Sequence, residues 1–181
     1  MLLTWFRIIL IPLFVGVFYV PQQWLSQDSQ NVLATWLFCI AGVTDWFDGY
    51  LARKWQQTSA FGAFLDPVAD KLMVVAALIL LVQLGRADAL LAMIIIGREI
   101  TISALREWMA SVGNRSGVAV AFIGKLKTTV QMVAIPCLIF KAPLLGLPIE
   151  AIGMVGLYLA AGLTLYSMGY YLHVAWPHLK A

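Results

Sequence analysis

Charge is scarce in this sequence. Only 12% of its 181 residues are charged, while 62% are hydrophobic, and the mean hydropathy is +0.88. These values lie far outside the range of a soluble globular domain and are typical of an integral membrane protein. The length leaves room for about six spans of ~20 residues and for no additional soluble module. We therefore predict an all-α integral membrane protein with six transmembrane helices, built as a single domain over residues 1–181.

Cysteine, histidine and internal repeats give little further information. Cys39 and Cys137 lie in separate apolar runs, so the sequence does not support a disulfide framework. The two histidines, His173 and His178, lie near the C-terminus, where we expect surface residues rather than catalysts. The first twenty residues lack a small-x-small cleavage site, which indicates a retained first span rather than a removed signal peptide.

Turn signals divide the chain into six apolar segments. We expect helices over residues 2–20, 31–53, 62–84, 88–110, 117–141 and 147–174. Segments two and four have their charges at their C-terminal ends, and segments three and five at their N-terminal ends. Because successive spans alternate in direction, these charges form one layer. Lys and Arg are more frequent in the connections on that side, so we expect this layer and both termini at the cytoplasmic face.

Four carboxylates belong to this layer: Asp45, Asp48, Asp66 and Asp70. The first two are three residues apart and the last two are four apart, so each pair lies on one face of a helix. The short connection makes the two helices antiparallel, and their acidic faces can meet. Four carboxylates so close repel one another unless cations bind. Oxygen ligands suit Mg²⁺ or Mn²⁺, and two such ions can assist a displacement at phosphorus.

Two glycines and an arginine accompany these acids. Gly49 and Gly62 lie on the acidic faces and leave room for phosphates to approach the backbone. Arg53, eight residues after Asp45, can reach a diphosphate. In the alternative, structural interpretation, an intramembrane acid pairs with a lysine to assemble helices. That explains one Asp more readily than four in facing register, so a functional site is favoured.

Basic residues form a second group, on segments four and five. They are Arg98, Arg106, Lys125 and Lys127. Glu99 can neutralise one arginine, most simply Arg106, but the basic groups outnumber the available acids. A bound phosphate is the natural remaining counter-ion, although a structural ion-pair network stays an alternative. Lys125 and Lys127 point to nearly opposite faces, so we expect only one of them to enter a cavity.

The acidic segment also resembles a known family signature. Asp45-x-x-Asp48-Gly49-x-x-Ala52-Arg53, followed after eight residues by Gly62-x-x-x-Asp66-x-x-x-Asp70, resembles the complete motif of the CDP-alcohol phosphotransferase family. The stretches "LLTWFR", "GREITISALREWMA" and "GKLKTT" resemble bacterial members that make phosphatidylglycerophosphate. Such members commonly have a few more residues, including an Asn, before "LLT".

The resemblance implies an activity, a location and partners. The chain would transfer the phosphatidyl group from CDP-diacylglycerol to sn-glycerol 3-phosphate, giving phosphatidylglycerophosphate and CMP at the bacterial cytoplasmic membrane. It would act as a homodimer and need two divalent cations, Mg²⁺ or Mn²⁺.

The resemblance also implies a role for each motif residue. The cations would be held by Asp45, Asp48, Asp66 and Asp70, and Asp70 would also act as general base. The nucleotide and its phosphates would contact Gly49, Arg53 and Gly62. The phosphate of the acceptor would be held by Arg98, Arg106, Lys125 and, as a fourth candidate, Lys127.

Some alternatives stay open. One alternative is a member of the same family with inositol phosphate or phosphatidylglycerol as its acceptor. Another is a small cation transporter, which would also need clustered acids. The outer halves of segments two to five have almost no polar groups, which argues against a transporter.

Gly156, Ala160 and Thr164 form a small-xxx-small run that fits a helix partner, either within the chain or across a dimer.

Overall fold

The computed structural model describes the backbone of residues 2–55, 60–111 and 121–179, and the side chains of residues 5–44, 68–69, 71–105, 124 and 126–169. The described backbone forms six α-helices: α1 Leu2–Val17, α2 Gln27–Trp55, α3 Ala60–Gln83, α4 Ala89–Ser111, α5 Ala121–Phe140 and α6 Ile149–Leu179. Within these ranges there is no β-strand, only an isolated bridge between Leu144 and Leu147. The predicted all-α class is confirmed.

Local capping explains where two of the helices begin. Helix α2 starts at Gln27, four residues before the predicted start, because Ser26 caps it: the Ser29 backbone N–H donates to Ser26 Oγ at 3.3 Å. Asp88 caps α4 in the same way, accepting the Leu90 N–H at 2.6 Å. The predicted start of the fifth helix, at residue 117, lies outside the described residues.

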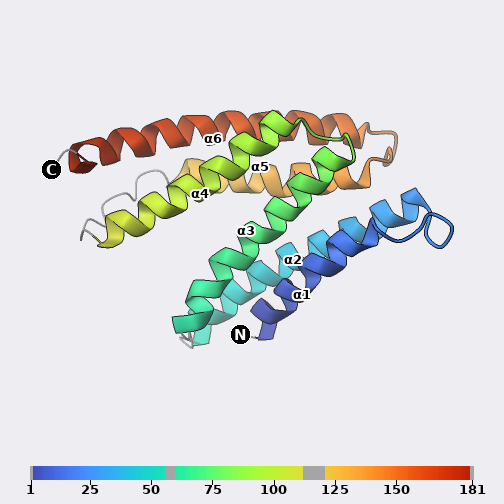
Figure 1. Cartoon of the computed structure of the whole chain (residues 1–181), viewed down its shortest axis with the longest axis horizontal. Helices are drawn as coiled ribbons and strands as arrows, with labels where there is room; N and C mark the ends of the chain where they lie inside the picture. The colour runs from blue at the N-terminus through green and yellow to red at the C-terminus, as the bar shows by residue number, and fades with distance from the viewer. Residues whose placement is uncertain (1, 56–59, 112–120, 180–181) are drawn as a thin grey trace.

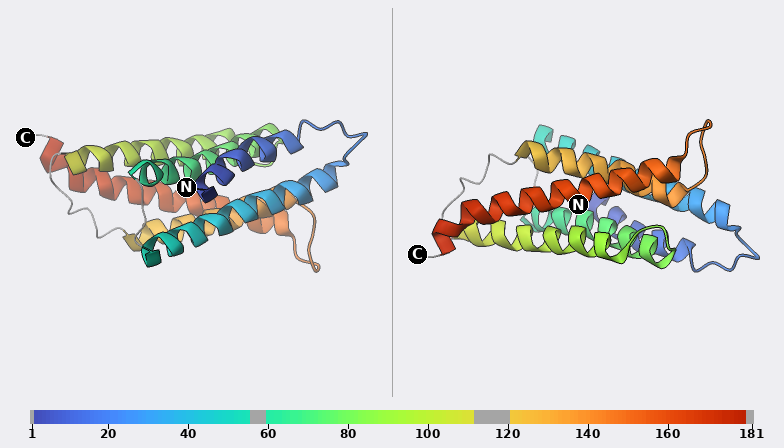
Figure 2. Two further views of the ribbon diagram at one scale, coloured as in Figure 1. Left: turned by 90° about the horizontal axis from the view of Figure 1, so that it is seen from below. Right: turned by 90° about the horizontal axis from the view of Figure 1, so that it is seen from above.

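Helices α4–α6 lie roughly alongside one another, and α1–α3 form a second group inclined to them (Figures 1 and 2). The α1–α2, α3–α4 and α5–α6 connections lie together at one end of the bundle. The last residues of α2 and α4 and the first residues of α3 and α5 lie at the other, which we call the charged end. Helices α1–α3 diverge from α4–α6 towards it (Figure 1). The charged segments therefore share one end, as their alternating direction predicts.

The surface of the bundle is apolar, whereas polar side chains are buried inside it. Every helix exposes large apolar side chains, among them Ile9, Trp36, Ile79, Met93, Val133 and Leu159. The buried polar side chains include Arg7, Asn31, Arg98, Lys127, Gln131 and Ser167. A helix of a soluble bundle usually shows the reverse arrangement, with its polar face outward. This distribution is the one expected when the surrounding medium is hydrocarbon.

Length and apolarity single out one candidate span within the described residues, Ile149–Gly169 of α6. Shorter apolar stretches occupy Trp5–Val17, Lys71–Gln83 and Leu126–Phe140. Helix α3 has charges in its second and third turns and α5 in its second turn, and these charges shorten the apolar run. The predicted six spans therefore stay a prediction.

Arg86 ties the helices together at the end opposite the charged end. It is 6% exposed and donates to the Ile139 carbonyl of α5 at 2.7 Å and to Asn31 Oδ1 of α2 at 2.9 Å. Burial lowers the pKa of the Arg86 guanidinium from its usual value. Arginine nevertheless remains charged in proteins. Carbonyls at the C-terminus of a helix attract such a cation. Gly85, with φ +66°, makes the tight turn after α3 that precedes it.

Helices α5 and α6 pack through small residues. A Cβ on Gly156 would stand 2.9 Å from Ala134 Cβ, and one on Gly153 would stand 3.0 Å from the Ala134 carbonyl oxygen. The next members of the run, Ala160 and Thr164, are fully buried. The small-xxx-small run thus seats a partner within the chain, which resolves one of the alternatives left open by the sequence.

We predict that Gly156→Ala destabilises the protein and that Gly162→Ala does not. The added methyl at Gly156 meets Ala134, whose Cβ cannot move without the backbone, and overpacking of this kind costs ~1–3 kcal/mol. Gly162 lies in the same helix with nothing within 4 Å, so its replacement should be neutral or stabilising by up to ~1 kcal/mol. Thermal unfolding of both variants in one detergent measures the difference. Equal midpoints would contradict the close contact.

Candidate functional site

The sequence signature lies on the two helices that meet across the shortest connection at the charged end. Asp45, Asp48, Gly49 and Arg53 belong to the last three turns of α2, which ends at Trp55. Gly62, Asp66 and Asp70 belong to the first three turns of α3, which starts at Ala60. Both stretches are α-helical, so the spacings place each acidic pair on one helix face as predicted. The side chains of these residues, like those of Arg106 and Lys125, lie outside the described part, so their convergence stays a prediction.

Among the described side chains, the main charged group centres on Glu99 of α4. Its carboxylate accepts hydrogen bonds from Arg98 Nη1 at 3.0 Å and from Lys127 Nζ of α5. Arg98 Nη2 also donates to Ser167 Oγ of α6 at 2.8 Å. Three helices are therefore joined through one carboxylate and its two cations. We call Arg98, Glu99 and Lys127 the ion triad.

The described partners of Glu99 are Arg98 and Lys127, whereas the simplest pairing predicted, with Arg106, involves a side chain outside the described part. Arg98 is adjacent in sequence, and Lys127 approaches from α5 and is only 1% exposed. Position 106 lies two turns beyond Glu99 on the same face of α4. The sequence predicts that Lys125 and Lys127 point to nearly opposite faces. Of the two, Lys127 is buried and forms an ion pair with Glu99.

The ion triad has an excess of positive charge. Two cations share one carboxylate, and the Nε of Arg98 is buried without a hydrogen-bond partner among the described residues. A buried cation that lacks full compensation is costly, and more so beside lipid. Among the described side chains, the positive charge of the ion triad is therefore only partly compensated.

A polar pocket adjoins the ion triad between α3, α4 and α5. It is lined by Lys71, Val74, Glu99, Thr128, Gln131 and Met132. Lys71 Nζ donates to Ser103 Oγ, which in turn donates to the Glu99 carbonyl at 2.6 Å. Position 70 precedes Val74 by one turn of α3 and shares its face, and position 125 precedes Thr128 in the same way on α5. Asp70 and Lys125 thus belong to the faces that border this pocket.

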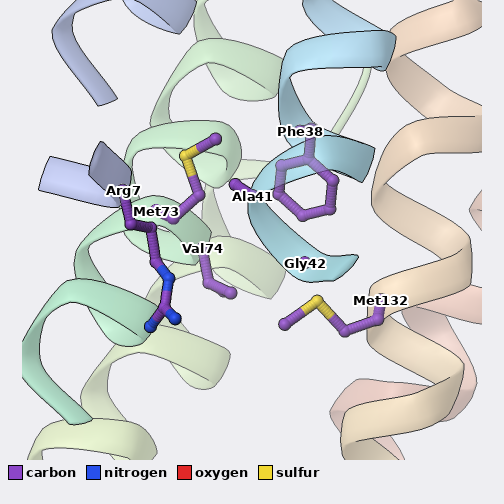
Figure 3. Close-up of a pocket in the computed structure, with 7 residues that line it drawn as sticks. All are labelled: Arg7, Phe38, Ala41, Gly42, Met73, Val74 and Met132. Carbon is purple, nitrogen blue, oxygen red and sulfur yellow. The ribbon is translucent and has the colours of Figure 1, made fainter. Parts of the chain in front are cut away.

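A second, mostly apolar pocket contains a buried arginine that the sequence analysis did not assign to the site. Arg7 of α1 is 1% exposed and lies beside Met73 and Val74 of α3, with Phe38, Gly42 and Met132 completing the pocket (Figure 3). The available signal was a single charge inside an otherwise apolar first span. A buried cation at this depth is usually functional or paired.

The donor set of the signature fits a hard divalent cation. Residues 45–70 contain four aspartates and neither histidine nor cysteine. Carboxylate oxygens without nitrogen or sulfur ligands favour Mg²⁺ or Mn²⁺ over zinc. Among the described side chains no other group of three potential ligands occurs.

Fold and site together define a class: a helical bundle with an apolar surface, whose acidic signature and basic residues lie on the helix segments nearer to one end. The model of the CDP-alcohol phosphatidyltransferase family matches residues 1–166, and the chain belongs to this family. The family predicted from the signature is confirmed.

Three relatives show the similarity along the whole chain. All three are named CDP-diacylglycerol–glycerol-3-phosphate 3-phosphatidyltransferase. The protein of Pectobacterium atrosepticum is 52% identical over 176 residues, which are 96% of this chain and 92% of the relative. That of Haemophilus influenzae is 54% identical over 175 residues, 96% and 90% of the two chains. That of Salmonella typhimurium is 51% identical over 176 residues, 96% and 92%.

We predict that Glu99→Gln strongly destabilises the protein, because it leaves Arg98 and Lys127 buried without their carboxylate. Breaking a buried pair costs about 3–5 kcal/mol. The double variant Glu99→Gln/Lys127→Met should recover much of that loss, because it also removes one of the cations. Thermal unfolding in detergent measures both.

Glu150→Gln is the matched control. Glu150 is half-exposed, and its Oε1 lies 4.0 Å from Lys141 Nζ. Losing this surface ion pair should lower the free energy of unfolding by at most ~1 kcal/mol. Equal effects of the two Glu→Gln changes would show that the ion triad contributes no more than a surface pair.

Proposed function

We propose that the chain transfers the phosphatidyl group of CDP-diacylglycerol to sn-glycerol 3-phosphate, releasing CMP and forming phosphatidylglycerophosphate. The observation that supports this most directly is the complete signature on α2 and α3 in a chain that aligns over 96% of its length with relatives of that name. The relatives' names state the activity predicted from the sequence. The excess positive charge of the ion triad adds independent support for a phosphorylated acceptor.

We further propose a six-span bacterial cytoplasmic-membrane protein that uses residues 1–181 as one domain, with the charged end and both termini in the cytoplasm. Apolar side chains are exposed on all six helices, as lipid contact requires. The connections at the opposite end contain two cations, Arg86 and Lys141. Arg86 is buried and bonds to the Ile139 carbonyl, so Lys141 is the exposed one. The contrast in Lys and Arg between the two ends then becomes larger.

The aspartates are proposed to hold two divalent cations, Mg²⁺ or Mn²⁺. The proposed ligands are Asp45, Asp48, Asp66 and Asp70. When bound, the cations would neutralise the diphosphate of the CDP-lipid and stabilise the leaving CMP. Gly49 and Gly62 leave space for the phosphates, and Arg53 adds a bidentate contact.

Asp70 is proposed as the general base. Its carboxylate takes the proton from the primary hydroxyl of the acceptor, and that oxygen attacks the lipid-bearing phosphorus. The bond from this phosphorus to the bridging oxygen breaks, and CMP leaves with that oxygen. The position of Asp70, one turn before the pocket-lining Val74, supports the role.

The acceptor phosphate is proposed to bind the basic group, with a division of labour that the described contacts suggest. Arg98 and Lys127 are held by Glu99 and supply positive charge from inside the bundle. Arg106 and Lys125 lie closer to the charged end, from which a water-soluble acceptor enters, and are proposed to contact the phosphate.

We also propose a homodimer. Its interface lies away from the face of α6 that holds Gly156, because α5 covers that face.

The direct test is an assay of the purified chain with CDP-diacylglycerol and a panel of acceptors, following CMP release. We expect turnover with sn-glycerol 3-phosphate. Excess chelator should abolish this turnover and added Mg²⁺ or Mn²⁺ should restore it, because four clustered carboxylates need cations to accept a diphosphate. Preferred use of inositol phosphate or phosphatidylglycerol would change the acceptor but not the class. Full activity in excess chelator would contradict the metal proposal.

We predict that Lys125→Ala raises the KM for glycerol 3-phosphate. Losing one charge-assisted hydrogen bond costs about 1.5–3 kcal/mol, which corresponds to roughly 10- to 150-fold. The KM for CDP-diacylglycerol should change little, because the aspartates and Arg53 hold that substrate. Lys141→Ala, at the opposite end, is the control and should alter neither value. If both KM values rose together in Lys125→Ala, the lysine would have a structural role instead.

A further inference from the structure

Gln131 is a buried polar side chain whose amide forms no hydrogen bond with any described residue. It is 5% exposed and lines the pocket between α3, α4 and α5. The other buried amides behave differently. Gln30 donates to the Val20 carbonyl at 2.8 Å, and Asn31 accepts from Arg86 at 2.9 Å.

The Gln131 amide borders the open space of the pocket, and closing that space around it without a partner would cost about 1–3 kcal/mol. If this position served packing alone, an apolar residue of similar size, such as the methionine at the neighbouring position 132, would be more favourable. The remaining polar groups of the pocket are already engaged: Lys71 with Ser103, and Glu99 with Arg98 and Lys127. Thr128 donates to the Gly124 carbonyl at 2.9 Å. Gln131 is therefore the polar side chain of this pocket that has no hydrogen bond with a described residue.

The location of the pocket matches the middle of the proposed acceptor. In glycerol 3-phosphate the reacting primary hydroxyl and the phosphate stand at opposite ends of a three-carbon body, and the central carbon bears a secondary hydroxyl. Asp70 on α3 is proposed to meet the first group, and the basic residues of α4 and α5 the second. The body between them must lie where α3, α4 and α5 meet, and the pocket is lined by these three helices.

We infer that this pocket receives the carbon body of the acceptor and that Gln131 hydrogen-bonds its secondary hydroxyl. The inference rests on the proposed function. A primary amide suits this hydroxyl because it can donate from nitrogen and accept at oxygen. Gln131 thereby distinguishes a glycerol phosphate from a phosphorylated alcohol without the central hydroxyl. A site built to bind a hydroxyl disfavours the analogue that lacks it, since its polar group is then left unpaired.

The test compares sn-glycerol 3-phosphate with 3-hydroxypropyl phosphate, which keeps the phosphate and the primary hydroxyl but lacks the secondary one. We expect the parent protein to favour the natural acceptor by at least about 10-fold in kcat/KM, equivalent to ~1.4 kcal/mol. Gln131→Leu should lower kcat/KM for glycerol 3-phosphate by about that factor and leave the value for 3-hydroxypropyl phosphate within about twofold. The preference of the parent would then largely disappear.

Gln30→Leu is the matched control, because it removes the amide of another buried glutamine, at the opposite end of the bundle. It should leave the ratio between the two acceptors unchanged. Should Gln131→Leu fail to fold, Gln131→Asn keeps the amide but withdraws it by one methylene and should reduce the ratio in the same direction.

The outcomes separate the two proposals. A parent protein that is inactive with both acceptors in the presence of CDP-diacylglycerol and Mg²⁺ would overturn the proposed function. A parent that is active but uses both acceptors equally, or a Gln131 variant that loses both equally, would overturn the role of Gln131 alone.

Discussion

The position of one carboxylate, that of Glu99, determines much of the architecture at the charged end. Helices pack in lipid without a hydrophobic driving force between them, so buried polar contacts help to fix how they meet. Glu99 joins α4 to α5 through Lys127, and Arg98 extends the connection to α6 through Ser167. The described ion triad has two cations for one carboxylate, so the contacts that hold the helices also supply the positive charge that the proposed acceptor site uses.

The two ends of the bundle satisfy their polar groups in different ways. At the end opposite the charged end, Arg86 bonds to neutral oxygens of α2 and α5, so its hydrogen-bonding demand is met within the chain. The close packing of Gly156 on α5 adds a rigid contact between long helices. At the charged end, α1–α3 diverge from α4–α6 (Figure 1), and the Nε of Arg98 has no hydrogen-bond partner within the described part of the chain. Among the described residues, the first end therefore satisfies its polar groups within the chain, whereas the charged end keeps one buried donor free, which agrees with the proposal that a ligand binds there.

The sequence predicts those features that depend on spacing along one helix. Asp45 and Asp48 share a face because α2 is helical there, and the fixed gaps of the signature identify the family. The sequence does not predict contacts that depend on how helices rotate against one another. The pairing of Glu99 with Lys127, the burial of Arg86 in a connection and the packing of Gly156 within the chain all depend on distances between helices. Short-range capping shifts helix ends as well, as Ser26 does for α2.

The two proposed substrate sites lie on different parts of the bundle, the acidic signature on α2 and α3 and the basic group on α4 and α5. Reaction requires that these parts keep a fixed relation at the point of transfer. Among the described polar contacts, the hydrogen bond from Lys71 to Ser103 joins α3 to α4. Lys71 directly follows the proposed base, and Ser103 lies between Glu99 and Arg106 on one face of α4. Among the described contacts, this hydrogen bond is therefore the polar link nearest to both proposed sites, and the pocket that holds Gln131 lies beside it.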